Sequence, residues 1–190
     1  MLAEGISVML GEPTIPMNLS FEIRTEDKFS FLTHWAAKYD YPADEKYTQN
    51  IGKPLTEKSR QELFEWKNGS VISKAKTSSI LKNYPLDFSG DQRARYLDHR
   101  EPGGAIWNIF YLHCLDPEKW PIFDQHTFRA MRYIQTGHIT EIGITNKQKY
   151  TAYLNEYLPF LRNFETESAR KVDKALFAFG QFLKIAARYI

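Results

Sequence analysis

The sequence predicts an all-α protein, and two observations lead to that expectation. Apolar residues recur at helical spacing through most of the chain, and sustained alternation of apolar and polar residues is almost absent. Capping residues also stand where seven or eight helices would begin and end. We therefore expect one helical domain over residues 1–190, with residues 1–20 irregular, built as a compact bundle or as two helical lobes with a cleft between them.

Composition excludes several classes of protein. Hydrophobic residues make up 43% and aromatic residues 15% of the 190 positions, which is too much apolar surface for a disordered chain. No apolar run approaches the roughly 18 residues of a bilayer crossing, and the N-terminal residues lack the pattern of a signal peptide, so we expect no membrane partner. The net charge of +2 permits nucleic-acid binding without arguing for it.

The single cysteine bears on cofactors and on location. Cys114 cannot form an internal disulfide and cannot supply the several thiolates of a zinc or iron–sulfur site. We expect no cofactor, no metal and a reducing, cytoplasmic location.

In the first half of the chain, apolar stripes and stop signals mark three helices. The first carries Phe29, Leu32, Trp35 and Ala36 on one face and ends at the Tyr41-Pro42 step. Thr56 caps the second, which stops at Asn68-Gly69, and the third runs from Val71 to Leu81. Ser89 and Gln92 form a capping box ahead of a further helical segment.

In the second half, Gly103-Gly104 opens a segment that is apolar around most of its circumference, AIWNIFYLHCL, and therefore predicts a buried central helix. Asp124 precedes a helix with Gly137 as its C-cap, and Thr145 with Gln148 forms another capping box. Pro159 should kink the helix that follows. The last helix carries Val172, Leu176, Phe179 and Leu183 on one face.

Residues 101–132 carry a motif with chemical meaning. Asp124-Gln125-His126-Thr127-Phe128-Arg129 has the form D-x-H-x-x-R, and Pro102-Gly103-Gly104 stands upstream, before an apolar helix and a proline-containing loop. This arrangement resembles the core of the helix-hairpin-helix base-excision DNA glycosylase superfamily. In that family a hairpin of the form L-P-G-x-G-x-K-T-A precedes an apolar helix and a D-x-H-x-x-R segment whose aspartate is catalytic. The resemblance covers about thirty of the 190 residues.

The resemblance implies a DNA partner and a set of site residues. Asp124 would be the catalytic carboxylate, which stays ionised beside the sugar of an extruded nucleotide and stabilises the positive charge that develops there. The residues implied for DNA binding are Gly103, Gly104, Trp107, His126 and Arg129.

This chain departs from the family pattern at the hairpin. Pro102-Gly103-Gly104 lacks the residue that separates the hairpin glycines, which puts the phosphate-binding turn in question. Ile106 or Trp107 occupies the position of the Schiff-base lysine of bifunctional members, and neither can attack a sugar carbon. If the chain is an enzyme, the resemblance therefore implies a monofunctional N-glycosylase.

Each of these residues also has a structural interpretation. Asp124 can serve as an N-cap without any catalytic role. His126 can be an interior histidine, and the side-chain stem of Arg129 can cover the core. Trp107 and Trp120 can be core aromatics. The alternative function is a non-catalytic helical interaction or nucleic-acid-binding protein with a degenerate glycosylase fold. The position of Asp124 separates the two interpretations, since an enzyme needs it in a cleft and a simple cap can lie on a convex surface.

A metal cluster is the other constellation that the sequence suggests. Its candidates lie close together, but they fit no ligand spacing, and adjacent helical residues point in different directions. The candidates are His113, Cys114, Asp116, Asp124 and His126.

Overall fold

The computed structural model describes residues 23–86 and 93–189, and within those ranges it contains helices and no strand, as predicted. The longer helices are α1 (Lys28–Ala36), α3 (Glu57–Asn68), α4 (Lys74–Asn83), α5 (Ala105–Leu115), α6 (Gln125–Thr136) and α9 (Ala169–Ala186). The shorter elements are α2 (Asp44–Asn50), α7 (Asn146–Ala152), α8 (Leu158–Leu161) and the 3-10 turns Arg93–Leu97 and Arg162–Phe164.

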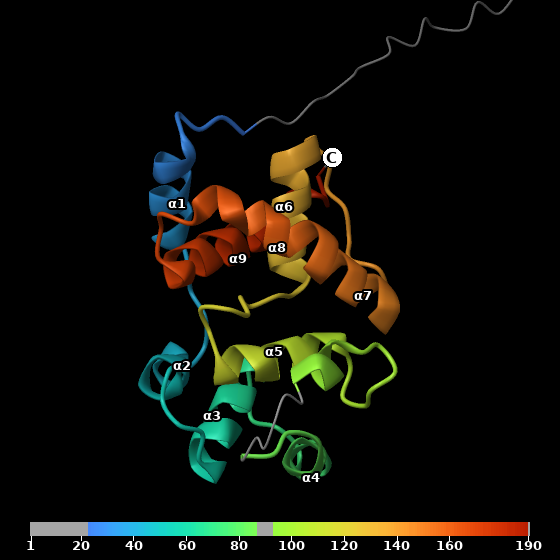
Figure 1. The fold of residues 1–190 in the computed structure, drawn as a ribbon. Helices are drawn as coiled ribbons and strands as arrows, with labels where there is room; N and C mark the ends of the chain where they lie inside the picture. The colour runs from blue at the N-terminus through green and yellow to red at the C-terminus, as the bar shows by residue number, and fades with distance from the viewer. Residues whose placement is uncertain (1–22, 87–92, 190) are drawn as a thin grey trace, which may run out of the picture.

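The helices form two lobes (Figure 1). The upper lobe contains α1, α6, α7, α8 and α9, and the lower lobe contains α2, α3, α4 and α5. Each lobe has its own cluster of buried side chains, one centred on residues such as Leu32, Met131 and Leu176 and the other on residues such as Leu63 and Phe110. Helix α5 lies on the boundary, since Ile109 belongs to the upper cluster and Phe110 to the lower.

Capping residues set the helix ends where the sequence predicts them. Thr56, Asp124 and Thr145 each accept a hydrogen bond from the backbone N–H three residues on, and each belongs to a capping box. Gly69 and Gly137 end α3 and α6 in the left-handed region, at φ of 71° in both cases.

Two predictions in the first half of the chain are wrong. Phe29 is 58% exposed, because α1 turns Phe31, Leu32 and Trp35 toward the core instead. Helix α1 also ends at Ala36 and not at the Tyr41-Pro42 step, and the short α2 that follows has no predicted counterpart.

The third predicted helix also shifts. Helix α4 begins at Lys74 after the cap Ser73, so Val71 precedes it and is 79% exposed. The predicted capping box at Ser89 and Gln92, and the irregular residues 1–20, lie outside the described residues.

Helices α7 and α8 are continuous through a π turn over Tyr153–Tyr157. Leu158 and then Pro159 follow, and Pro159 lacks the N–H that a regular helix would need there. The structure therefore has a wider turn close to the residue where the sequence predicts a kink, and the kink itself stays a prediction.

Among the described residues, no helix combines the length and the apolar character needed to cross a membrane.

Candidate active site

Asp124 lies at the joint between the two lobes. It is the N-cap of α6, and its Oδ1 accepts hydrogen bonds from the backbone N–H groups of His126 at 2.9 Å and Thr127 at 3.1 Å. Its Oδ2 accepts from the Nζ of Lys67, in α3 of the lower lobe, at 3.0 Å. The side chain keeps 17% of its surface exposed. Asp124 therefore caps its helix and also holds a charge contact across the lobe boundary.

The surroundings of Asp124 keep it ionised. Burial by itself raises the pKa of a carboxyl group, but the charge of Lys67 and the N–H of Thr127 outweigh it and hold the pKa of Asp124 below its ordinary value. The helix N-terminus favours the same charged form. At neutral pH the site therefore contains a carboxylate, as the proposed chemistry requires.

Aromatic side chains from both lobes surround this carboxylate. They enclose a cavity of about 10 Å³, which is at the lower limit for one water molecule. The residues around it are Tyr39, Tyr41, Trp66, Lys67, Ile122, Asp124, Asp173 and Phe177. Asp124 thus lies among aromatics between two lobes and not on a convex surface.

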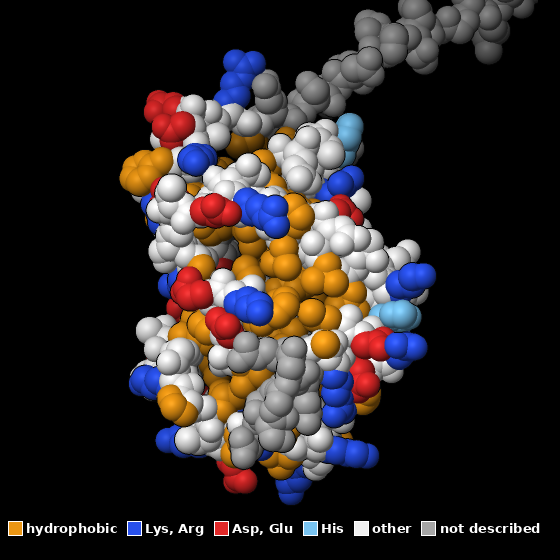
Figure 2. Space-filling view, viewed as in Figure 1, with side chains coloured by type: hydrophobic (Ala, Val, Ile, Leu, Met, Phe, Trp, Pro, Cys, Tyr) orange, Lys and Arg blue, Asp and Glu red, His pale blue; other side chains and the backbone are white. Residues whose placement is uncertain are grey.

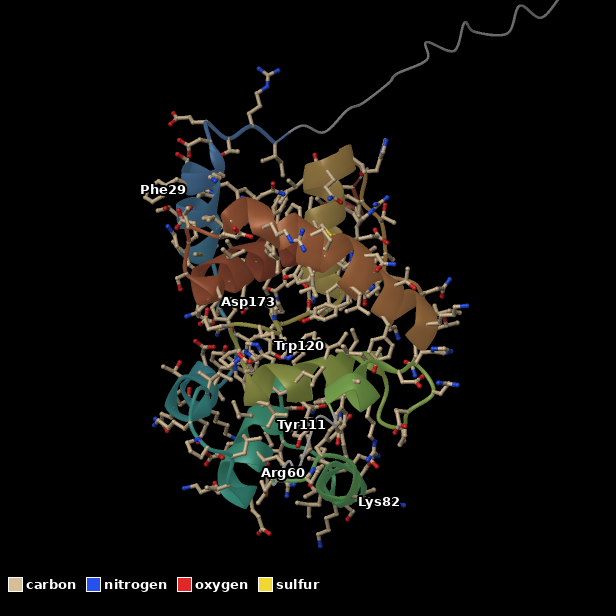
Figure 3. All side chains as sticks on the ribbon, viewed as in Figure 1. Phe29, Arg60, Lys82, Tyr111, Trp120 and Asp173 are labelled. Atoms are coloured by element: carbon tan, nitrogen blue, oxygen red, sulfur yellow. The ribbon has the colours of Figure 1, made fainter. Side chains whose placement is uncertain are left out.

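A second carboxylate, Asp173, stands on the same small cavity. It projects from α9 toward the lower lobe (Figure 3), and its side chain is 12% exposed. Burial raises its pKa to about 6, and the nearby Asp124 carboxylate acts in the same direction, while Arg170 opposes both. The two carboxylates therefore differ in protonation behaviour although they face one space.

Arg170 connects the lobes beside Asp173. Its guanidinium donates to Asp173 on its own helix and to Asp44 of α2, and it lies over the ring of Tyr47 with its centre 4.2 Å from the ring centroid. Lys174 of α9 also forms an ion pair with Asp44, at 3.2 Å. Together with the Lys67–Asp124 pair, these contacts join α9 and α6 to α2 and α3.

Asp173 also lines a much larger cavity. Its volume is about 770 Å³, within the range of pockets that hold small ligands. Asp173 and Ile122 line both cavities, and Tyr47, His113 and Tyr157 add buried walls to the large one. Figure 2 shows hydrophobic side chains across the middle of the molecule, with charged side chains at the edge of this area.

The predicted hairpin does not present its first helical N–H to solvent. Gly103 and Gly104 adopt φ of 102° and 84°, so the turn before α5 depends on residues without a side chain. The N–H of Ala105, however, donates to the side-chain oxygen of Asn146 in the upper lobe at 3.1 Å. The α5 N-terminus is therefore already capped from within the protein.

Trp107 is half-buried in the lower lobe. Its ring stacks on Phe64 at 5.5 Å between centroids, and the Nζ of Lys76 lies 4.0 Å from its ring centroid. It does not meet Asp124, so the structure places it near the hairpin and α4. Trp120 is also half-buried and packs against both hydrophobic clusters, and its indole N–H has no hydrogen-bond partner among the described residues.

Arg129 and His126 are structural in this conformation. The Arg129 guanidinium is 1% exposed and donates to Glu141 and to the carbonyl oxygen of Gly180, so it is not available to a DNA phosphate. His126 packs on Phe177 and contacts Arg129, and burial lowers its pKa. The DNA-binding role implied for Arg129 does not agree with its position, because its polar atoms are used inside the upper lobe.

His113 and Cys114 are interior residues. His113 contacts the hydroxyl of Tyr47 and the carbonyl oxygen of Trp120, both at 2.8 Å, and burial lowers its pKa to about 3. Burial raises the pKa of the Cys114 thiol, which disfavours the reactive thiolate. In the part of the chain that the structure describes, no group of three or more His, Cys, Asp or Glu residues is placed to hold a metal ion.

Lys67, Asp173 and Arg170 are the site residues that the sequence analysis misses. They come from α3 and α9, far from the D-x-H-x-x-R segment in sequence, and no motif joins them to it. The one available signal is their position at the ends of amphipathic helices whose apolar faces include Trp66 and Phe177.

Comparisons of the chain with protein-family models, with curated proteins and with solved structures find no match.

Proposed function

We propose that the chain is a DNA-binding, DNA glycosylase-like protein that hydrolyses the bond between a damaged base and its deoxyribose, with Asp124 as the catalytic carboxylate. The observation that carries the proposal is the placement of Asp124. An ionised carboxylate stands at a helix N-terminus, between two lobes and among aromatic side chains, and it belongs to the D-x-H-x-x-R segment. A cap on a convex surface would support only the non-catalytic alternative.

In the proposed reaction, Asp124 stabilises positive charge on the sugar. As the base leaves, positive charge develops on the deoxyribose, and a fixed carboxylate lowers the energy of that state more than the energy of the neutral substrate. Oδ1 is held by two backbone N–H groups, which leaves Oδ2 to face the sugar. Water then adds to the sugar carbon and completes hydrolysis.

Lys67 has to leave Asp124 before a sugar can approach. Its Nζ lies beside Oδ2, in the place that the positively charged sugar would take in the proposed reaction. The cavity at that point is also too small for a nucleotide. Binding of DNA therefore requires the lobes to separate at this contact. Lys67 forms an ion pair with Asp124 in this conformation, and the proposal gives it no nucleophilic role.

A lysine-rich surface near the hairpin supports a DNA partner. Residues 66–86 contain four lysines and no acidic residue, and Lys74 and Lys82 of α4 are exposed. Lys76 of the same helix lies over Trp107, which follows the Gly103-Gly104 turn. The exposed Lys74 and Lys82 can bind the phosphate backbone, the role that Arg129 does not fill.

The test measures abasic-site formation in duplexes that each carry one of a panel of damaged bases. We expect wild type to release at least one base and to leave an abasic site that breaks only on alkali treatment, while Asp124→Asn slows release by at least about 100-fold. Asp40→Asn, at an exposed carboxylate outside the site, is the matched control and should match wild type.

Binding separates the remaining outcomes. Substitution of Lys74 and Lys82 by Glu should weaken retention of undamaged duplex at low salt and reduce its dependence on salt. If wild type forms no abasic site with any base and retains no DNA, the non-catalytic interaction protein is the correct interpretation.

A further inference from the structure

Four side chains from the α1–α2 connection, α2 and α3 form a cage that suits a cation. Tyr47 and Trp66 pack ring against ring, with 4.4 Å between their centroids. Asp44 accepts hydrogen bonds from the hydroxyl of Tyr39 at 2.9 Å and from the indole N–H of Trp66 at 3.3 Å. The cation cage, formed by Tyr39, Asp44, Tyr47 and Trp66, therefore has aromatic walls and a carboxylate that two of those walls hold in place.

A cation from the other lobe occupies this cage. The central carbon of the Arg170 guanidinium, in α9, lies 4.2 Å from the ring centroid of Tyr47 and 5.0 Å from that of Tyr39. It lies 5.3 Å from the ring centroid of Trp66. Aromatic rings attract cations at distances of up to about 6 Å. The guanidinium also donates to Asp44 and, at 3.0 Å, to the hydroxyl of Tyr39. The cage therefore holds Arg170 both by its charge and by its N–H groups.

The contacts that build the cage do not include Arg170. The two hydrogen bonds to Asp44 and the packing of Tyr47 on Trp66 lie wholly between residues 39 and 66. These contacts fix the carboxylate and two of the rings without any atom of α9. A site that is formed before its ligand arrives loses little conformational entropy on binding, so another guanidinium can fill it.

Arg170 can leave the cage and still keep a partner. It also donates to Asp173, one turn further along α9. Lys174 of the same helix forms an ion pair with Asp44 at 3.2 Å and lies 4.8 Å from the ring centroid of Tyr39. If α9 moves away from α2, Asp173 stays with Arg170, whereas Asp44 loses its ion pairs with both α9 cations. The vacated cage then has a negative charge that favours a cation from outside.

The large cavity gives access to the cage. Tyr47, Arg170 and Lys174 all line this cavity of about 770 Å³, which is large enough for a small organic molecule. A molecule inside the cavity is therefore next to the guanidinium that fills the cage.

We propose that the cation cage is a binding site for a small alkylguanidinium compound and that Arg170 is its internal ligand. The external compound takes the place of Arg170 and releases α9 from the lower lobe. A guanidinium fits better than an ammonium, because it is planar and its N–H groups can reach a carboxylate and a hydroxyl together. The cage is then a site through which a soluble cation controls how firmly the two lobes are joined.

The first experiment tests the site with the internal ligand removed. Arg170→Ala empties the cage, and we expect low-millimolar methylguanidinium to raise the melting temperature of this variant by about 2 °C or more, because the ligand binds the folded protein. Sodium chloride of equal ionic strength and urea, which is planar but uncharged, should give no rise. Arg132→Ala is the matched control, since Arg132 pairs with Glu156 outside the cage, and it should not respond. Absence of a rise in Arg170→Ala overturns the inference.

The carboxylate shows whether the ligand occupies the cage itself. Asp44→Asn in the Arg170→Ala background keeps the shape of the cage and removes its charge, so the affinity for methylguanidinium should fall by at least about tenfold. Equal affinities of the single and double variants would place the ligand elsewhere and overturn the inference.

Displacement of Arg170 is measured with the cage and Arg170 both intact. Spin labels on Lys58→Cys in α3 and Lys147→Cys in α7, two exposed positions, report the distance between the lobes, while the buried Cys114 is shielded from the label. We expect methylguanidinium to shift this distance to longer values and urea or sodium chloride to leave it unchanged. An unchanged distance with methylguanidinium overturns the inference and leaves Arg170 as a fixed structural contact. The proposed excision of damaged bases is independent of all three measurements.

Discussion

The N-termini of α5 and α6 both follow proline-containing turns, and the resemblance to the glycosylase family implies that both face DNA. In the structure, the N–H groups at these two helix N-termini have different kinds of hydrogen-bond acceptor. At α5, the side-chain amide oxygen of Asn146, in the other lobe, accepts a hydrogen bond from the N–H of Ala105. At α6, the side chain of Asp124 accepts hydrogen bonds from the backbone N–H groups of its own helix. It stays ionised and forms an ion pair with Lys67 in the other lobe. A neutral cap joins the lobes without leaving a charge, whereas the charged cap leaves between them the carboxylate to which we assign the proposed catalysis.

The largest expected effect concerns the packing behind the α6 N-terminus. Gly180 of α9 lies against the backbone of His126, and a methyl group there would overlap the carbonyl oxygen of His126. We expect Gly180→Ala to lower the free energy of unfolding by about 3 kcal/mol or more, measured by urea denaturation. Gly137→Ala, at the open C-terminal end of α6, should cost only about 1 kcal/mol, from its positive φ. Equal losses would show that α9 does not fix the start of α6.

The second effect tests the charged cap itself. Asp124→Ala removes the cap and leaves Lys67, which is 8% exposed, without its partner. We expect a loss of about 3 kcal/mol at pH 7, most of it recovered in the double variant Lys67→Met, Asp124→Ala. Failure of the double variant to recover would show that the cap and not the ion pair dominates.

The contribution of Asp124 should depend on pH in a defined direction. Its pKa in the folded protein is below its ordinary value, so the stabilisation is present above about pH 4 and is lost as the pH falls through the folded value. Chemical denaturation from pH 7 to pH 3 should therefore show wild type approaching Asp124→Ala at the acid end.

The third effect tests the turn before α5. A side chain at Gly103 would overlap the hydroxyl of Tyr84 and approach Asn108, and φ is 102°. Gly103→Ala should lower the free energy of unfolding by about 2 kcal/mol. Gly52→Ala is the control with a similar backbone problem, φ of 73°, and open space around it, and it should cost about 1 kcal/mol.

The smallest effect tests the neutral cap. Asn146→Ala leaves the N–H of Ala105 without an acceptor and should cost about 1 kcal/mol by thermal or urea denaturation. Asn146→Asp keeps an acceptor and adds a negative charge at a helix N-terminus, so it should fall within a few tenths of a kcal/mol of wild type or exceed it. A large loss in Asn146→Asp would mean that the amide makes contacts beyond this bond.

Local signals explain which elements the sequence predicts well. Thr56, Asp124 and Thr145 begin helices because each carries its own hydrogen-bond acceptor for the N–H groups that follow. Helix α2 escapes prediction because it has seven residues and buries only Tyr47, which is too little for a periodic pattern. The helical pattern predicts the wrong face for Phe29, because Phe31 satisfies helical spacing with Leu32 and Trp35 equally well.

The candidate site is less predictable than the helices. Asp124 stands in a recognisable motif, but Lys67 and Asp173 reach it only through the packing of α3 and α9 against the lobe boundary. For Arg129 the motif misleads, because its position in the motif implies a DNA contact. In the structure its N–H groups donate instead to Glu141, twelve residues on, and to the carbonyl oxygen of Gly180. Spacing along a chain reports helix faces, and it carries no information about which faces meet.

The pairing of α1 with α9 has a consequence for the order of synthesis. The lower lobe, α2 to α5, is continuous in sequence, so its buried cluster is complete before most of the upper lobe exists. Phe31 and Trp35 of α1, by contrast, pack on Phe179, near the end of the chain. A ribosome therefore releases α1 well before α9, and α1 must wait with its apolar face uncovered until α9 emerges.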